Sequence, residues 1–264
     1  MIRSIFTAAS GMKAQQMYVD NISHNLANVN TTAFKKSRLE FNDLMYQTMI
    51  EPGAPTSQAT HSPTGLQVGL GVKSIANHKI YSQGSLTQTG SIYGMAIRGQ
   101  GFFQVMRPDG TIAYTRDGSF KISDDGTLVS SAGFAMEPEI IIPEDAVDNS
   151  LQIDDDGIIS VLLEGDEVAT EIGQLELASF INPAGLKSVG DNLYEETRAS
   201  GEPVLEPPGA RFTGDVSQGY LENSNVEMVE EMVNLITAQR AYEISSKAVQ
   251  VSEEMLQTAN QIKR

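Results

Sequence analysis

The chain has 264 residues, no cysteine, and 34 acidic against 18 basic side chains, which gives a net charge of −16 at pH 7. The absence of cysteine excludes disulfides and thiolate metal sites, and the acidic balance argues against nucleic acid or an anionic membrane as a partner. No segment reaches the ~18 apolar residues that a membrane-spanning helix needs, and the first 30 residues lack the apolar run and cleavage site of a secretory signal peptide.

The N-terminal segment carries apolar residues at alternating steps of three and four. This spacing predicts a helix over residues 2–29 with one narrow apolar face, the geometry of coiled-coil packing. The helix is expected to end where asparagines and threonines gather near residue 30. Only Gln15 interrupts the apolar row, whose other members are Ile5, Ala8, Met12, Val19, Ile22, Leu26 and Val29.

Residues 51–71 are rich in residue types that interrupt helices and strands. Proline, glycine, serine and threonine fill 12 of these 21 positions. The segment is therefore too poor in apolar side chains to fold alone. We expect residues 34–80 to form an extended arm or linker; a surface loop is the alternative.

The stretch from about residue 80 to residue 221 has the pattern of short strands joined by tight turns. Asp-Gly pairs begin at Asp109, Asp117, Asp125 and Asp156, between segments of alternating polarity. Asp-Gly is a strong hairpin signal because both central residues of a type I′ turn need positive φ. Antiparallel hairpins in series indicate a β-sandwich or an open barrel.

The acidic excess is confined to one block within this stretch. Residues 137–206 hold 18 acidic side chains against only Lys187 and Arg198, and the charges on either side of the block cancel. Such a block is typical of a solvated face that keeps a protein soluble. The functional alternative is an outward surface that repels or slides against an acidic neighbour.

The C-terminal segment predicts a second long helix. Ser224 and Glu227 have the spacing of a capping box, and Glu230 and Glu231 extend the acidic start. A five-residue step between two apolar rows rotates the stripe and gives this helix two contact faces. The first row is Val226, Val229, Val233 and Ile236; the second, broken only by Thr258, is Ala241, Ile244, Ala248, Val251, Met255 and Ile262.

Neither helix can bury its apolar face within itself, so each must find another helix. The expected fold class is α+β. Residues 1–33 and 224–264 form a discontinuous helical domain with coiled-coil-like packing, residues 34–80 the arm, and residues 81–223 an all-β, hairpin-rich central domain. Two amphipathic helices lying on one globular core are the alternative from the pattern alone.

Signs of catalysis or cofactor binding are absent from the sequence. The three histidines are widely separated, and no nucleophile elbow, zinc-binding helix motif or phosphate loop occurs. Gly99 and Gly101 begin a dinucleotide fingerprint, but Gln104 takes the place of the third glycine. The run from Asp154 to Gly157 resembles a calcium loop but lacks the carboxylates required at both ends, so a turn explains it. We expect no enzyme activity, cofactor or metal.

Three segments resemble the rod and hook family of bacterial flagellar axial proteins. Residues 25–35 (NLANVNTTAFK) are similar to its N-terminal signature, and residues 99–105 (GQGFFQV) with 114–118 (YTRDG) to its central β-segment. Residues 233–236 (VNLI), 239–243 (QRAYE) and 246–247 (SK) are similar to its C-terminal signature. The resemblance covers nearly the whole chain in the right order. One departure is Ala33, where the family usually has glycine.

The resemblance implies a structural subunit that polymerises into a hollow helical shaft. Residues 46–54 resemble a segment that separates distal rod subunits from hook subunits, which favours the distal rod, between proximal rod and hook. The implied partners are further copies of the chain, proximal rod and hook subunits, and the surrounding envelope rings. The implied location is the basal body across the periplasm, reached through the flagellum's own type III export apparatus without a cleaved signal.

On this interpretation the helices make two kinds of contact. We expect the first helix to pack on the second through the second apolar row, and the other face of the second helix to meet adjacent subunits. The arm would lie between subunits and the acidic block would face outward. The predicted interface residues are Ile5, Ala8, Met12, Val19, Ile22, Leu26, Leu235, Ala238, Tyr242, Ala241, Ile244, Ala248, Val251 and Met255.

Three other functions stay open from the sequence. A proximal rod or hook subunit would share the terminal helices, although a hook subunit should lack the arm and carry a larger middle. A cell-wall hydrolase on a β-scaffold would need a carboxylate pair, which 34 acidic residues always offer. A monomeric adhesin would keep its function after truncation of the terminal helices.

Overall fold

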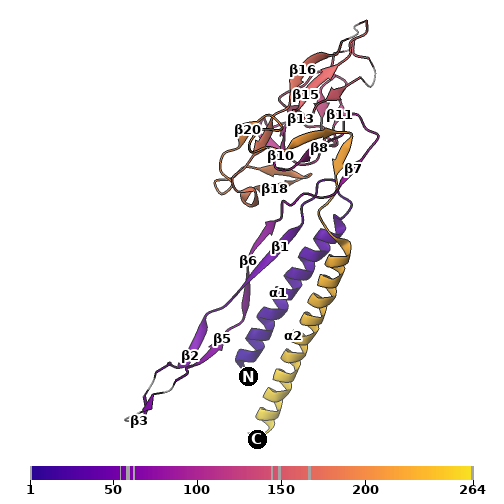
Figure 1. Cartoon of the computed structure of the whole chain (residues 1–264). Coiled ribbons are helices and arrows are strands. Elements are labelled where there is room, and N and C mark those ends of the chain that lie inside the picture. Colours follow the sequence, from indigo (N-terminus) through magenta and orange to yellow (C-terminus); the bar gives the residue numbers. More distant parts are fainter. Residues whose placement is uncertain are drawn as a thin grey trace. The chain divides into compact units, whose positions relative to one another are not determined.

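The computed structural model describes residues 2–262 except 54, 58–59, 62, 144, 148–149 and 166–167. Parts of the predicted arm and of the acidic block thus lie outside the described residues. The chain divides into two compact units. The helical unit consists of Met1–Ala27, Ser37–His78 and Glu227–Arg264, and the β unit of Asn28–Lys36 and Lys79–Val226. The fold is α+β, with a helix near each terminus and strands between them (Figure 1).

Two long helices, α1 (Ile2–Ala27) and α2 (Met228–Ile262), run antiparallel in the helical unit (Figure 1). The predicted end of α1 is two residues too long, because the chain turns at residues 28–30. The start of α2 has the predicted acidic residues, because Glu230 and Glu231 lie in its first turn. The predicted capping box is wrong: the helix begins at Met228, and the Ser224 hydroxyl accepts a hydrogen bond from the Val226 N–H at 3.3 Å. Acidic side chains there complement the positive end of the helix dipole.

The arm is a two-stranded ribbon made of nested antiparallel pairs rather than a plain loop. It runs beside α1: the Val72 N–H donates to the Ser10 hydroxyl at 3.3 Å, and the rings of Tyr18 and Phe41 meet edge to face. The pairs are β1 (Ser37–Asp43) with β6 (Val72–Lys79), β2 (Tyr46–Ile50) with β5 (Leu66–Gly69), and β3 (Pro55–Ser57) with β4 (Thr60–His61).

The β unit contains a seven-stranded sheet of order β11-β12-β13-β9-β10-β19-β18 and four smaller sheets, β14-β15-β16, β17-β20, β21-β8 and β22-β7. Every pair with a recorded register among them is antiparallel. The strands are β7 (Leu86–Gln88), β8 (Met95–Arg98), β9 (Phe103–Met106), β10 (Ile112–Thr115), β11 (Lys121–Ile122), β12 (Leu128–Val129), β13 (Ala135–Glu137), β14 (Gln152–Ile153), β15 (Ile158–Val161), β16 (Thr170–Gln174), β17 (Leu177–Ser179), β18 (Lys187–Gly190), β19 (Leu193–Glu195), β20 (Val204–Glu206), β21 (Asp215–Gln218) and β22 (Tyr220–Glu222). A 3-10 turn spans Pro183–Gly185.

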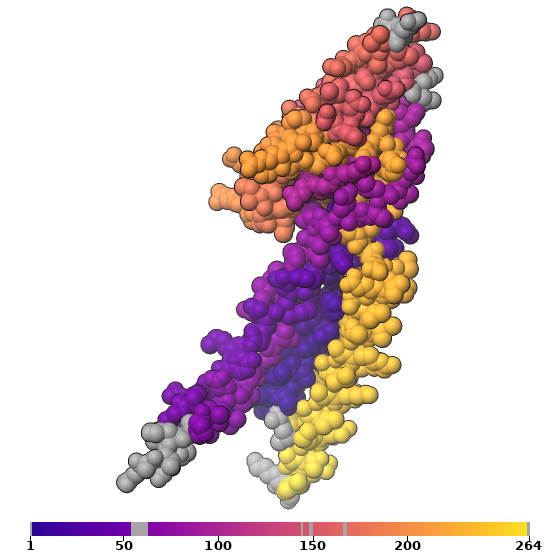
Figure 2. Space-filling model, viewed as in Figure 1, coloured from indigo at the N-terminus to yellow at the C-terminus, as the bar shows by residue number. Residues whose placement is uncertain are grey.

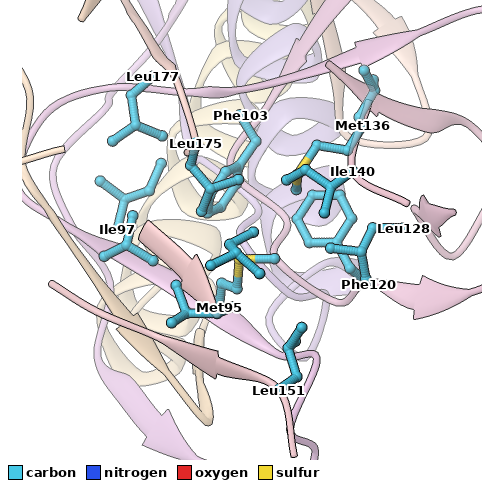
Figure 3. Close-up of a cluster of buried hydrophobic side chains, with 14 of the residues drawn as sticks. Met95, Ile97, Phe103, Phe120, Leu128, Met136, Ile140, Leu151, Leu175 and Leu177 are labelled. Atoms are coloured by element: carbon cyan, nitrogen blue, oxygen red, sulfur yellow. The ribbon is translucent and has the colours of Figure 1, made fainter. Parts of the chain in front are cut away.

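The core of the β unit is one cluster of buried apolar side chains from most of these strands (Figure 3). Phe103 and Phe120 lie at its centre with ring centroids 5.3 Å apart, edge to face. Met95, Leu128 and Met136 surround them, each at most 1% exposed. A second buried cluster of aromatic residues includes Phe102, Tyr114 and Tyr194. The β unit therefore has a continuous apolar core of its own, although large apolar residues such as Ile181 and Phe212 remain on its surface.

Three of the four Asp-Gly pairs turn hairpins, but not in the predicted type I′ geometry. At Asp109, Asp125 and Asp156 only the glycine has positive φ, between 76° and 78°. The hydrogen bonds from Gly110 N to Arg107 O and from Arg107 N to Thr111 O instead indicate a type I turn with a glycine bulge. The fourth pair, Asp117-Gly118, turns no hairpin. Its glycine instead lies so close to Met95 that a Cβ at this position would overlap the Met95 carbonyl oxygen. This glycine is needed for a close backbone approach.

Candidate assembly interface

The contact between α1 and α2 repeats every seven residues. The Ser4 and Ser252 hydroxyls lie 3.1 Å apart, and a Cβ on Gly11 would lie 3.5 Å from the Ser245 hydroxyl. The Asn25 amide donates to the Glu231 carboxylate at 3.4 Å. On α1, seven residues separate Ser4 from Gly11 and fourteen separate Gly11 from Asn25. On α2, their partners show the same spacing, seven residues from Ser252 to Ser245 and fourteen from Ser245 to Glu231. The two helices therefore keep one constant register along their length.

Small and polar side chains form this contact. Ala238 and Ser252 of α2 and Ala14 of α1 are at most 5% exposed. Such residues let two helix backbones approach closely, as large apolar side chains do not. We call the α2 residues on this side the inner seam: Glu231, Leu235, Ala238, Ser245, Val249, Ser252 and Leu256, all buried or half-buried.

A buried polar cluster fixes the end of α1 against the first residue of the ribbon. The Asn25 amide group accepts from the Ser37 N–H at 3.0 Å and donates to its carbonyl at 2.9 Å, so it pairs with that residue as a strand neighbour would. The Asn21 amide donates to the same carbonyl at 2.8 Å. Buried polar groups satisfied in this way specify one register, because any shift would leave them unpaired.

The predicted α1 residues are buried or half-buried, and their place in an interface stays a prediction, whereas the predicted pairing face of α2 is wrong. Ile22 is buried and Ile5, Ala8, Met12, Val19 and Leu26 are half-buried. In α2, however, Ile244 is 67% exposed, Val251 and Met255 are half exposed, Ala248 is exposed, and only Ala241 is half-buried. Leu235 and Ala238, expected to face neighbours, instead pack toward α1. Tyr242 lies at the edge between the two faces.

The apolar residues that the prediction assigned to the α1 contact form part of an exposed stripe along α2. We call it the outer stripe: Val229, Val233, Ile236, Ile244, Val251, Met255 and Ile262. Its members recur at steps of three, four, seven and eight and lie about half a turn from the inner seam, because an α-helix advances about 100° per residue. A stripe of this length on a helix surface marks an interaction site.

A groove lies between the two helices on a third face of the unit. Its volume is about 420 Å³, and it is lined by Gln16 and Val19 of α1 and by Gln239, Tyr242 and Glu243 of α2. Figure 2 shows α1 (indigo) and α2 (yellow) side by side along the unit. The groove combines an apolar wall with polar rims.

The ribbon also exposes large apolar side chains. Met45 is 84% exposed, and Tyr46, Met49, Ile50 and Leu66 on β2 and β5 are each about half exposed. A two-stranded ribbon has no core of its own, so these side chains have no intramolecular site in which to be buried.

A buried ion cluster that the sequence did not predict joins distant parts of the β unit. Lys35 Nζ lies 2.5 Å from Glu222 Oε1 and donates to the Ser82 carbonyl at 2.9 Å. Arg116 Nη1 lies 3.6 Å from Glu222 Oε2, and its Nη2 donates to the Gly99 carbonyl at 2.6 Å. Burial lowers the pKa of Lys35 and of Arg116, and Glu222 opposes both shifts.

This cluster gives a physical role to two of the motifs. Lys35 belongs to the segment 25–35 and Arg116 to the segment 114–118, and both cations meet one carboxylate placed just before α2. A separation of 187 residues between Lys35 and Glu222 explains why no local pattern revealed the pair. Ala33, beside it, has φ of 56°, the conformation that favours glycine.

Among the described residues, no group of three or more histidine, aspartate or glutamate side chains could hold a metal ion. The run from Asp154 to Gly157 forms the turn between β14 and β15. Neither described helix is long and apolar enough to cross a membrane.

Three family models match consecutive parts of the chain. Residues 5–35 match the model described as flagella basal body rod protein, and residues 96–161 the D1 domain of flagellar hook protein FlgE/F/G. Residues 217–262 match the C-terminal region of flagellar basal body rod FlgEFG protein. These ranges contain most of α1, part of the β unit, and all of α2.

Full-length relatives share the whole chain. The flagellar basal-body rod protein FlgG of Borreliella burgdorferi (strain ATCC 35210 / DSM 4680 / CIP 102532 / B31) is 50% identical over 264 residues, covering 100% of both chains. FlgG of Buchnera aphidicola subsp. Schizaphis graminum (strain Sg) is 50% identical over 99% of this chain and 100% of its own. FlgG of Bacillus subtilis (strain 168) is 38% identical over 100% of both.

Proposed function

The chain belongs to the FlgG family of flagellar basal-body rod proteins, and from this premise we propose that it polymerises into the hollow distal rod that links the proximal rod to the hook. It is a structural rod subunit, and the family is not one of enzymes. The observation that carries the proposal is the outer stripe. A helix that leaves seven large apolar residues exposed along its length needs a partner to cover them.

The helices supply the polymer contacts in this proposal. The seven-residue repeat between Ser4, Gly11 and Asn25 on α1 and their partners on α2 supports coiled-coil-like packing within one subunit. The outer stripe remains for contacts with other subunits. Contacts between unlike faces of identical chains build open helical filaments when the rotation between copies does not close a ring.

In this proposal each of three segments has a separate role in the rod. Residues 1–33 and 224–264 form the polymer core, residues 34–80 the arm between subunits, and residues 81–223 the outer β domain. The exposed Met45, Tyr46 and Met49 support a covered position for the arm in the assembly. The acidic block would lie on the outside of the shaft, facing the envelope rings.

The location follows from the same proposal. The rod would span the periplasm, and the subunit would reach it through the flagellar type III apparatus in an unfolded state. Its neighbours are proximal rod subunits at one end, hook subunits at the other, and the envelope rings around it. No nucleic acid or membrane insertion takes part.

Electron microscopy of purified protein at rising concentration tests the proposal. We expect tubes from the natural chain. Val251→Asp places a charge in the outer stripe, so tubes should be lost while the circular dichroism of the β unit stays unchanged. Ala259→Asp is the control, because it adds the same charge at an exposed position of α2 outside the stripe and outside the groove lining. Tubes formed equally well by Val251→Asp would contradict the role of the stripe.

A further inference from the structure

Apolar residues lie seven positions from two residues of the groove lining, Val19 on α1 and Tyr242 on α2. On α1 the row through Val19 contains Met12 and Leu26, each seven residues away. On α2 the row through Tyr242 contains Leu235 and Val249, again seven residues away. All except Tyr242 are half-buried, and Tyr242 is 42% exposed. Steps of seven keep residues on one face of a helix, so each row follows the helix side that carries one groove-lining residue, next to the inner seam.

The outer stripe has the matching periodicity. Ile244 and Val251 are seven residues apart, as are Met255 and Ile262, and Val229 and Ile236. Helices pack when the ridge of one enters a groove of equal repeat on another. The ridge and the groove of one copy lie on different faces of α2, so the same helix pair cannot use both for itself.

From this match we infer that the outer stripe of one copy lies in the α1–α2 groove of a second copy. The inference rests on the proposed function and specifies its central contact. Each copy then offers one ridge and one groove, and every contact leaves a free ridge at one end and a free groove at the other. Assembly by such a contact continues as an open helix when the rotation between copies does not close a ring.

Charge supports the same pairing. Arg240 and Lys247 are exposed and fall between members of the outer stripe. The groove is bordered by Glu243, and exposed Asp20 adjoins Val19 on its α1 side. In the single chain Arg240 reaches Glu243 of its own helix at 2.9 Å, an exposed pair that exchanges partners at little cost. Such rim charges set the orientation of the two copies more than their affinity.

The absence of cysteine makes the contact directly testable. Gln239→Cys places a thiol in the groove of one tagged copy, and Val233→Cys, Ile244→Cys or Val251→Cys places one in the stripe of a differently tagged copy. Mixed tubes are then oxidised and the two tags are read on a non-reducing gel. Lys13→Cys, on an exposed position of α1, is the matched control for the stripe thiols.

We expect mixed-tag disulfides for at least one stripe position, with a yield about tenfold above that of Lys13→Cys, because a docked pair holds its thiols at high effective concentration. Tubes that give only stripe–stripe or groove–groove disulfides would overturn the inference, because the contact would then be between like faces. Tubes whose groove thiol stays unlinked to all three stripe positions would overturn it too, and would leave the proposed function intact. Failure of the natural chain to form tubes would instead remove the proposed function itself.

Discussion

In the β unit, 17 buried apolar residues form one continuous cluster, whereas the described residues of the helical unit bury only Ala14, Ile22 and Ala238. The other buried residues of the helical unit are polar: Asn21, Asn25, Ser37, Glu231 and Ser252. Its large apolar side chains lie on the surface. The β unit therefore obtains its stability from its own core, whereas the helical unit leaves most of its large apolar side chains partly or fully exposed.

The largest expected effect comes from removing one large side chain from each unit, which tests whether only the β unit depends on a buried core. Phe103→Ala empties the centre of the β core, so we expect a loss of about 3–5 kcal/mol in its free energy of unfolding. Ile244→Ala removes an exposed side chain, so the dilute chain should change by less than about 0.5 kcal/mol. Denaturant titration of both variants measures this. A comparable loss from Ile244→Ala would mean that the outer stripe is buried within a single chain.

The ion cluster offers a smaller test of the β unit. Glu222→Gln keeps the shape but leaves the buried cations Lys35 and Arg116 without a compensating charge, so we expect a loss of about 2–3 kcal/mol. Glu195→Gln is the matched control, because that carboxylate pairs with Arg107 and Lys187 nearer the surface and should cost about 0–1 kcal/mol. Equal losses from the two variants would show that the buried cluster adds nothing special to stability.

The pH dependence should also distinguish the units, with a smaller effect. Burial raises the pKa of Tyr114 to about 12, and raises the pKa of Tyr81 and of Tyr194 as well. Above the ordinary tyrosine pKa of about 10 the unfolded chain loses these protons while the folded chain keeps them, so stability falls as pH rises from 10 toward 12.

Burial lowers the pKa of Lys35 and of Lys79, which acts in the opposite direction. The unfolded chain then binds more protons at these lysines, so their contribution rises with pH until the unfolded lysines titrate near 10.4. We expect the unfolding midpoint of the β unit to hold up to about pH 10 and then to fall. Tyr114→Phe should reduce the fall; an unchanged slope in this variant would contradict the assignment.

The extents of the helices could be predicted from the sequence because periodicity is local. The rows at Ile5 to Leu26 and at Ala241 to Met255 are helical, as expected. The pairing face was wrong because the prediction gave the inner contact to the most apolar row. Close helix approach instead selects Gly11, Ser245 and Ser252, whose small side chains carry little hydrophobic signal.

The Asp-Gly pairs correctly predicted hairpins at Asp109, Asp125 and Asp156. Their turn type was wrong, because a type I′ turn needs positive φ at both residues and only the glycine has it there. Gly118 was misassigned because its role depends on Met95, a residue distant along the chain. The sequence did not predict the buried cluster of Lys35, Arg116 and Glu222 for the same reason, since its members are distant along the chain. Long-range contacts leave no periodic pattern in a sequence.

Amide hydrogen exchange in dilute subunits and in assembled tubes tests most directly whether α2 needs other copies to be stable. In dilute subunits we predict fast exchange along α2 and strong protection in β9 and β10. In tubes α2 should become protected, while the β strands change little. Equal and strong protection of α2 in both states would contradict the account, because the outer stripe would then contribute nothing to assembly.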